Sequence, residues 1–150
     1  MPEIVVGVDG SDHSRAALRW AMREAALCHL PLTVMTVDPG PVRPATMSYW
    51  GLHTYPENSH DLDHVRATVQ EFVDKAASEI GGPVPDVTVR VAAGDPAGEL
   101  VSASRAADLL VVGCRGSGGF ARLLMGSVSS QVTHHAGCPV VVIPGTRQPS

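Results

Sequence analysis

A run of glycines near the C-terminal end contains the residues whose types and spacing could do chemistry. The spacing is Gly113-x2-Gly116-x9-Gly126, with Ser127 following directly, and the run begins where an apolar stretch ends. Glycine lets backbone N–H groups approach a ligand closely, and the start of a helix attracts an anion through its dipole. The pattern therefore predicts a phosphate-binding site built mostly from backbone.

The same region lacks the groups that phosphate transfer requires. A P-loop needs a lysine directly after its second glycine, where it supports the β- and γ-phosphates. Lys75 is the only lysine of the chain and lies far from the glycines in the sequence. The first apolar run is followed by Gly7-x-Asp9-Gly10, which is not the Gly-x-Gly-x-x-Gly fingerprint of dinucleotide-binding proteins. We expect a protein that holds phosphates and is not an enzyme, with no catalytic residue to assign.

Composition limits the partners and the compartment. The net charge of −4 argues against a nucleic-acid surface, which depends on clustered lysine and arginine. The three cysteines, Cys28, Cys114 and Cys138, show no Cys-x-x-Cys spacing, so neither a disulfide framework nor a metal site in the protein itself is indicated. No apolar run approaches the roughly 20 residues that a membrane helix needs. We expect a cytoplasmic protein that binds neither nucleic acid nor a membrane.

Strand-like and helix-like segments alternate along the chain. Short apolar runs predict strands over Ile4–Val8, Leu32–Val37, Val87–Ala92, Leu109–Val112 and Pro139–Ile143. Helical spacing predicts helices from about Ser14 to Leu27, and over Leu62–Ile80 and Ser127–His135. Asp95 as N-cap and Pro96 in the first turn predict a further helix that runs to about Arg105. This alternation predicts one α/β domain over residues 1–150, with a parallel sheet, right-handed crossovers and helices on both faces.

Sheets of this kind bind ligands beyond the carboxyl ends of their strands, where the winding direction reverses. Asp9 follows the first predicted strand and Gly113 ends the fourth, so we expect the two to face each other across one crevice. Asp9 and Ser127 each also have a purely structural explanation. Asp9 could simply end a turn, and Ser127 could simply be the N-cap of its helix.

Four motifs together resemble the universal stress protein family. They are Val5-Val6-Gly7-Val8-Asp9-Gly10-Ser11, Gly94-Asp95-Pro96-Ala97, the glycine motif, and Ala136-Gly137-Cys138-Pro139-Val140-Val141-Val142. The resemblance covers nearly the whole chain. It implies a Rossmann-like single domain with a five-stranded parallel sheet in the order 3-2-1-4-5. Because the glycine motif is present, it also implies the branch of the family that binds ATP.

The resemblance further implies which residues hold the nucleotide. Adenine and ribose would lie among Gly7, Asp9, Thr36 and Val37. The phosphates would be held by Gly113, Gly116, Ser117, Gly118, Gly119, Gly126, Ser127 and Val128. Arg115 and Arg122 either reach a terminal phosphate through the guanidinium group or are exposed at the surface. The expected ligand is ATP, with or without Mg²⁺.

The function that follows is adenine-nucleotide binding in a stress-response or regulatory role, exerted through ligand binding and dimerisation. The resemblance implies a homodimer, and the apolar edge strand formed by Val140, Val141, Val142 and Ile143 is the candidate interface. Two alternatives remain open: a slow ATPase or nucleotidyl transferase, and a cyclic AMP-binding or interaction module. The long segment 38–60 lacks periodicity, which predicts either a lid over the nucleotide or a partner subunit, or disorder.

Overall fold

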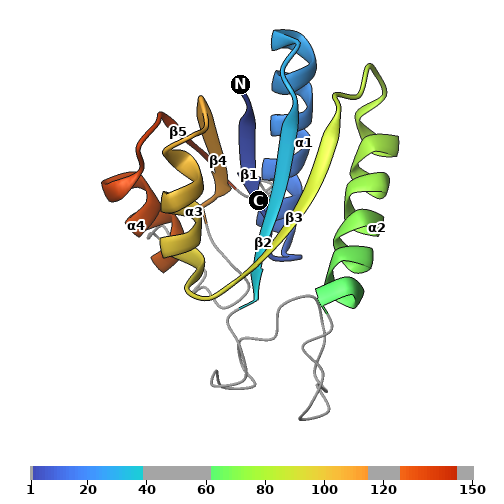
Figure 1. The fold of residues 1–150 in the computed structure, drawn as a ribbon. Helices are drawn as coiled ribbons and strands as arrows, with labels where there is room; N and C mark the ends of the chain where they lie inside the picture. The colour runs from blue at the N-terminus through green and yellow to red at the C-terminus, as the bar shows by residue number, and fades with distance from the viewer. Residues whose placement is uncertain (1, 39–61, 115–125, 145–150) are drawn as a thin grey trace, which may run out of the picture.

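A computed structural model describes residues 2–38, 62–114 and 126–144 of the chain. Within these ranges strands and helices alternate (Figure 1). The strands are β1 (Ile4–Gly7), β2 (Leu32–Asp38), β3 (Val87–Ala93), β4 (Leu109–Gly113) and β5 (Val140–Ile143). The helices are α1 (Asp12–Cys28), α2 (Leu62–Ile80), α3 (Pro96–Ser104) and α4 (Ser127–His135). Every predicted element is present, and most bounds differ from the prediction by one residue or none.

The start of α1 shows the largest difference, because the helix begins at Asp12 rather than near Ser14. Ser11 is the N-cap, and its side chain accepts a hydrogen bond from the Ser14 N–H at 3.2 Å. A capping serine satisfies one of the N–H groups that the first turn leaves without a partner. The cap therefore extends the helix toward β1 and brings its first turn to the carboxyl edge of the sheet.

The strands form one parallel sheet in the order β3-β2-β1-β4-β5, which confirms the predicted fold class. β1 is central, with Ile4 paired to Leu32 of β2 on one side and to Leu109 of β4 on the other. The chain runs outward from β1 to β2 and β3, then crosses to β4 and β5. Since every pair is parallel, the carboxyl ends of the strands lie along one edge.

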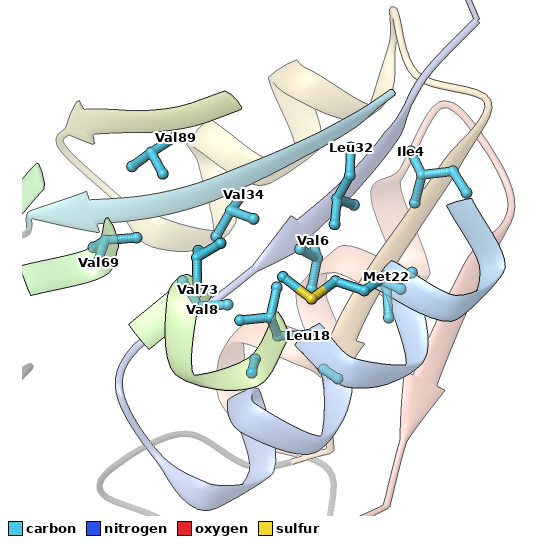
Figure 2. Packing of buried hydrophobic residues seen from close by; sticks show 14 of the residues in the cluster. Ile4, Val6, Val8, Leu18, Met22, Leu32, Val34, Val69, Val73 and Val89 are labelled. Atoms are coloured by element: carbon cyan, nitrogen blue, oxygen red, sulfur yellow. The ribbon is translucent and has the colours of Figure 1, made fainter. Parts of the chain in front are cut away.

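Helices cover both faces of this sheet. Figure 1 shows α1 and α2 on one face and α3 and α4 on the other. Neighbouring residues of β1 point to opposite faces, as strand geometry requires: Val6 packs on the α1 side and Val5 on the side of α3 and α4. On the first face Leu18 and Met22 of α1 lie fully buried beside Val6 (Figure 2). These two apolar layers fix the strand ends that carry the candidate site.

Candidate functional site

The ends of β1 and β4 are neighbours at the carboxyl edge of the sheet. Val6 pairs with Val111, so Gly7 and Gly113 close two adjacent strands. The winding direction reverses between these strands, and α/β sheets bind their ligands at such a point. The structure therefore brings together the two strand ends that the sequence analysis assigned to one site.

Gly113 lies against the first turn of α1. A Cβ atom at Gly113 would stand 2.9 Å from both the carbonyl carbon and the carbonyl oxygen of His13, closer than real Cβ atoms come to other heavy atoms. Next to it, the Sγ atom of Cys114 lies 3.9 Å from Nδ1 of His13, although the two residues are 101 positions apart. Helix packing therefore explains why position 113 is a glycine.

Gly7 has a packing role on the opposite face. A Cβ atom there would lie 3.0 Å from Cδ1 of Leu100 and 3.6 Å from Cγ1 of Val112. Leu100 belongs to α3 and is buried, so its methyl groups cover the end of β1. The two strand-end glycines thus let α1 and α3 approach the same edge of the sheet from its two sides.

Asp9 forms the turn between β1 and α1. Its Oδ1 atom accepts a hydrogen bond from the backbone N–H of Ser11 at 3.0 Å, which holds the residue that caps α1. The turn-forming role considered for Asp9 is therefore present. One carboxylate can accept several hydrogen bonds, so the bond from Ser11 does not prevent Asp9 from contacting a ligand. The ligand role of Asp9 stays a prediction.

Thr36 and Val37 direct their side chains into the interior. The Thr36 hydroxyl is buried and donates to the carbonyl oxygen of Val8 at 2.9 Å. The Val37 side chain is buried in the cluster beneath α3 and α4. Any contact of these two residues with a base would therefore use the backbone at the end of β2.

The N-cap of α4 is a glycine. Gly126 holds this position, with φ −56° and ψ 160°, and among the residues that the structure describes no side chain makes a capping hydrogen bond to the first turn. Ser127 is instead the first residue of the helix and is exposed. The N-cap role considered for Ser127 is therefore wrong. The helix keeps its predicted bounds, Ser127–His135, and the Gly126 N–H before it donates to the Cys114 carbonyl oxygen at 2.6 Å.

Ser129 joins the start of α4 to the end of β4. Its hydroxyl oxygen lies 3.1 Å from the carbonyl oxygen of Cys114 and 3.0 Å from that of Gly126, and the residue is 3% exposed. The N–H of Cys114 donates to the carbonyl of Ile143, which ties the same point to β5. Cys114 and Gly126, which flank the segment 115–125, are therefore held directly together.

Comparison with known proteins decides the family. The model of the universal stress protein family matches residues 1–144. The chain belongs to the universal stress protein family. The resemblance carried by the sequence motifs is thereby confirmed.

Individual members of the universal stress protein family show the extent of the similarity. A universal stress protein of Mycolicibacterium smegmatis is 36% identical over 150 residues, which are 97% of this chain and 49% of that protein. The chain thus spans about half the length of the curated relatives that it matches. A solved structure described as a universal stress protein in complex with cAMP has a TM-score of 0.67 and 28% identity, covering 97% of this chain and 98% of the other. UspA from Lactobacillus plantarum has a TM-score of 0.72 and 25% identity, covering 95% and 97%.

Part of the glycine motif of this universal stress protein lies outside the described residues. The predicted phosphate contacts there are Arg115, Gly116, Ser117, Gly118, Gly119 and Arg122. The predicted lid over residues 38–60 also lies outside the described residues, apart from Asp38 at the end of β2. The candidate site described for this universal stress protein therefore consists of the strand ends, the first turn of α1 and the start of α4.

The single lysine of this universal stress protein lies away from the carboxyl edge of the sheet. Lys75 is an exposed residue of α2, which packs against α1 and β3 rather than against α4. Within residues 2–38, 62–114 and 126–144, no three His, Cys, Asp or Glu side chains gather closely enough to hold a metal ion. None of the helices in these ranges has the length and apolar character that a membrane crossing requires.

Sequence reasoning missed two residues at the site of this universal stress protein. His13 lies directly before the predicted start of the first helix, and nothing in the sequence indicates that Gly113 packs against it. Ser129 is one of several hydroxyl residues in α4, and its neighbour Ser130 has the same chemistry. The burial of Ser129 follows only from the direction in which α4 leaves β4.

Proposed function

We propose that this universal stress protein binds an adenine nucleotide, with ATP as the ligand, at the carboxyl edge between β1 and β4. It acts in the stress response through ligand binding and dimerisation, without rapid catalysis. The observation that carries this proposal is the start of α4, where the N-cap is a glycine and no side chain of the described residues caps the first turn.

The start of α4 has the chemistry that a phosphate group requires. The first N–H groups of a helix have no intrahelical partner, and the helix dipole places partial positive charge at this end. Ser127 is exposed at the first helical position, and the backbone of Gly126 adopts an extended conformation before it. A bound phosphate would accept hydrogen bonds from these N–H groups, which is how helix N-termini bind anions without a lysine.

The adenine and ribose would occupy the ends of β1 and β2 beside this helix start. The neighbouring strand ends include Gly7 and the turn at Asp9, on the side of the sheet edge where the winding reverses. The cAMP complex of a universal stress protein 28% identical to this chain supports an adenine nucleotide as the ligand class. The same complex makes cyclic AMP the second candidate ligand.

The proposal that the protein holds ATP rather than consuming it rests on its charged groups. Phosphoryl transfer depends on cations that neutralise charge as it develops, and the lysine of a P-loop is one of them. The only lysine here is in α2, away from α4. Mg²⁺ would arrive as part of the ATP complex.

Dimerisation is proposed through the free edge of β5. This strand ends the sheet, and Val140, Val141, Val142 and Ile143 are all only half-buried. An apolar edge strand with unpaired backbone groups is a ready template for a second copy of the chain. The three free thiols of the chain suit a reducing compartment, and we place the protein in the cytoplasm.

Calorimetric titration of the purified protein with ATP, ADP and cyclic AMP tests the proposed function. We expect heat of binding with ATP and a smaller affinity for the cyclic ligand, whose single phosphate offers less charge to the helix start. ATP hydrolysis, measured as phosphate released over hours, should be no faster than with a Gly126→Val variant, which serves as the background. Gly126 has a backbone conformation open to any residue, so this variant should fold while its branched side chain obstructs the approach of a phosphate. Absence of heat with all three ligands would refute the proposed function.

A further inference from the structure

We propose that Ser129 is a positioning residue for phosphate binding: its buried hydroxyl holds the first turn of α4 against the end of β4. The inference rests on the proposed function, because the group being positioned is the helix start that would bind the phosphates. Ser129 itself would touch no ligand. Its effect passes through Gly126 and the N–H groups that follow.

The hydroxyl of Ser129 lies between two carbonyl groups that belong to different elements. One is the carbonyl of Cys114, at 3.1 Å, directly after β4, and the other is that of Gly126, at 3.0 Å, directly before α4. A hydroxyl has one proton, so it donates to one carbonyl at a time or is shared between both. Either arrangement restrains the helix start relative to the strand.

This geometry differs from ordinary capping at the third helical position. A capping side chain at this position reaches back to the N–H of the N-cap residue and so occupies a donor. Ser129 instead offers a donor to two carbonyls, and the Gly126 N–H is used by the Cys114 carbonyl at 2.6 Å. Within residues 2–38, 62–114 and 126–144, no side chain accepts from the N–H groups at the beginning of α4, as a phosphate site requires.

The hydroxyl of Ser129 restrains the two residues that flank the segment 115–125. Cys114 and Gly126 are the described residues that flank the segment 115–125, and the Ser129 hydroxyl adds a second link to the bond between them. A binding site made of backbone N–H groups depends on their exact mutual placement, because shifts of about 0.5 Å weaken hydrogen bonds to a bound group. Loss of the hydroxyl should therefore weaken the binding of phosphates more than the binding of the base.

The chain offers a matched control in Ser104. This serine is also fully buried, and its hydroxyl donates to the Val101 carbonyl and accepts from the Gly137 N–H at 2.8 Å. It therefore ties α3 to the residue beyond the far end of α4. Ser104→Ala therefore removes a comparable buried hydroxyl of α3 that bonds to the backbone beyond the C-terminal end of α4.

The test compares ATP with adenosine for the wild type, Ser129→Ala, Ser129→Thr and Ser104→Ala. We expect Ser129→Ala to weaken ATP binding about tenfold, the effect of one hydrogen bond, while adenosine affinity changes less than about twofold. The threonine variant keeps the hydroxyl and should restore most of the ATP affinity. Ser104→Ala should lower the melting temperature but leave the ratio of ATP to adenosine affinity unchanged.

Amide hydrogen exchange of the unliganded protein provides a readout that does not depend on a ligand. Ser129→Ala should accelerate exchange of the Gly126 N–H relative to amides of β1, whereas Ser104→Ala should not. Unchanged exchange together with an unchanged ATP-to-adenosine ratio would overturn the inference and leave the proposed function standing. A wild-type protein that binds no adenine nucleotide would refute the proposed function, and the inference about phosphate positioning would fall with it.

Discussion

His13 lies so close to Gly113 that a Cβ atom on Gly113 would stand 2.9 Å from the His13 carbonyl carbon. The contact joins the first turn of α1, which follows β1, to the end of β4. The atoms nearest to that position are the backbone carbonyl carbon and oxygen of His13, which cannot move aside as the end of a flexible side chain could. The first glycine of the motif is therefore required by packing, whether or not it also contacts a ligand.

Gly113→Ala should destabilise the fold by about 1–3 kcal/mol, the usual cost of forcing extra atoms into a packed site. Urea unfolding measures this change. The control is Gly82→Ala, because a Cβ at Gly82 meets nothing within 4 Å, and that variant should remain within about 0.5 kcal/mol of the wild type. Equal stability of the two variants would show that the contact between Gly113 and His13 is not as described.

Thr36→Val should cost about 1–3 kcal/mol, because the buried Val8 carbonyl loses the hydroxyl that donates to it at 2.9 Å. The side chain faces the interior, so nucleotide affinity should change less than about twofold. Thr68→Val serves as the control, since its hydroxyl bond to the His64 carbonyl is exposed on α2. A large loss of ATP affinity without loss of stability would instead place the Thr36 side chain at the ligand.

The helices and strands were predictable because apolar residues recur in the sequence at the spacing of each element. The apolar runs around Val6, Val34 and Val111 mark strands buried on both faces, and Asp95-Pro96 marks the start of α3 in both the sequence and the structure. The start of α1 was displaced because Ser11 rather than a later residue caps it. The order of the strands followed from the family resemblance, since periodicity alone does not determine neighbours in a sheet.

The site was predictable only in part, because contacts between distant segments leave no local pattern. Gly113 and Gly126 were found from their spacing, but the packing of His13 against Gly113 depends on how α1 crosses the sheet. Ser127 was considered as a cap because serine is a common N-cap, whereas in the structure Gly126 holds the N-cap position and its N–H donates to the Cys114 carbonyl. Ser129 is identical in type to Ser130, and only its burial separates them.

Cys138 should react slowly with iodoacetamide at pH 8, because burial and then the negative charge of Asp108 raise the pKa of its thiol. A raised pKa means less thiolate at a given pH, so the reaction should accelerate only above the pH at which a free thiol already reacts. Asp108→Asn should lower the pKa part of the way and speed the reaction. Asp74→Asn, on α2, is the charge-matched control and should leave the rate unchanged. Peptide mass spectrometry follows Cys138 separately, and a pH profile equal to that of the unfolded chain would contradict the prediction.

Val142→Pro should convert the proposed homodimer into monomer. Ile143 and Pro139 direct their carbonyls to β4, where they accept from Cys114 and Leu110, so the N–H of Val142 faces the free edge of β5. Proline removes that donor and is tolerated on an edge strand. Light scattering after gel filtration measures the mass.

Val91→Pro provides the control at the opposite edge of the sheet. β3 is the other terminal strand, and the Val91 N–H faces away from β2 by the same alternation. This variant should keep the mass of the wild type. A dimer that survives Val142→Pro but not Val91→Pro would move the interface from β5 to β3.

Amide NMR titration with ATP and, separately, with adenosine shows directly whether the start of α4 binds the phosphates. Both ligands should shift the signals of Gly7 and Asp9, and ATP alone should shift those of Gly126, Ser127 and Val128 at the start of α4. Signals at the amino edge, such as those of Glu3 and Asp108, should not move. Absence of ATP-specific shifts at Gly126–Val128, or shifts confined to the amino edge, would contradict a phosphate site at the start of α4.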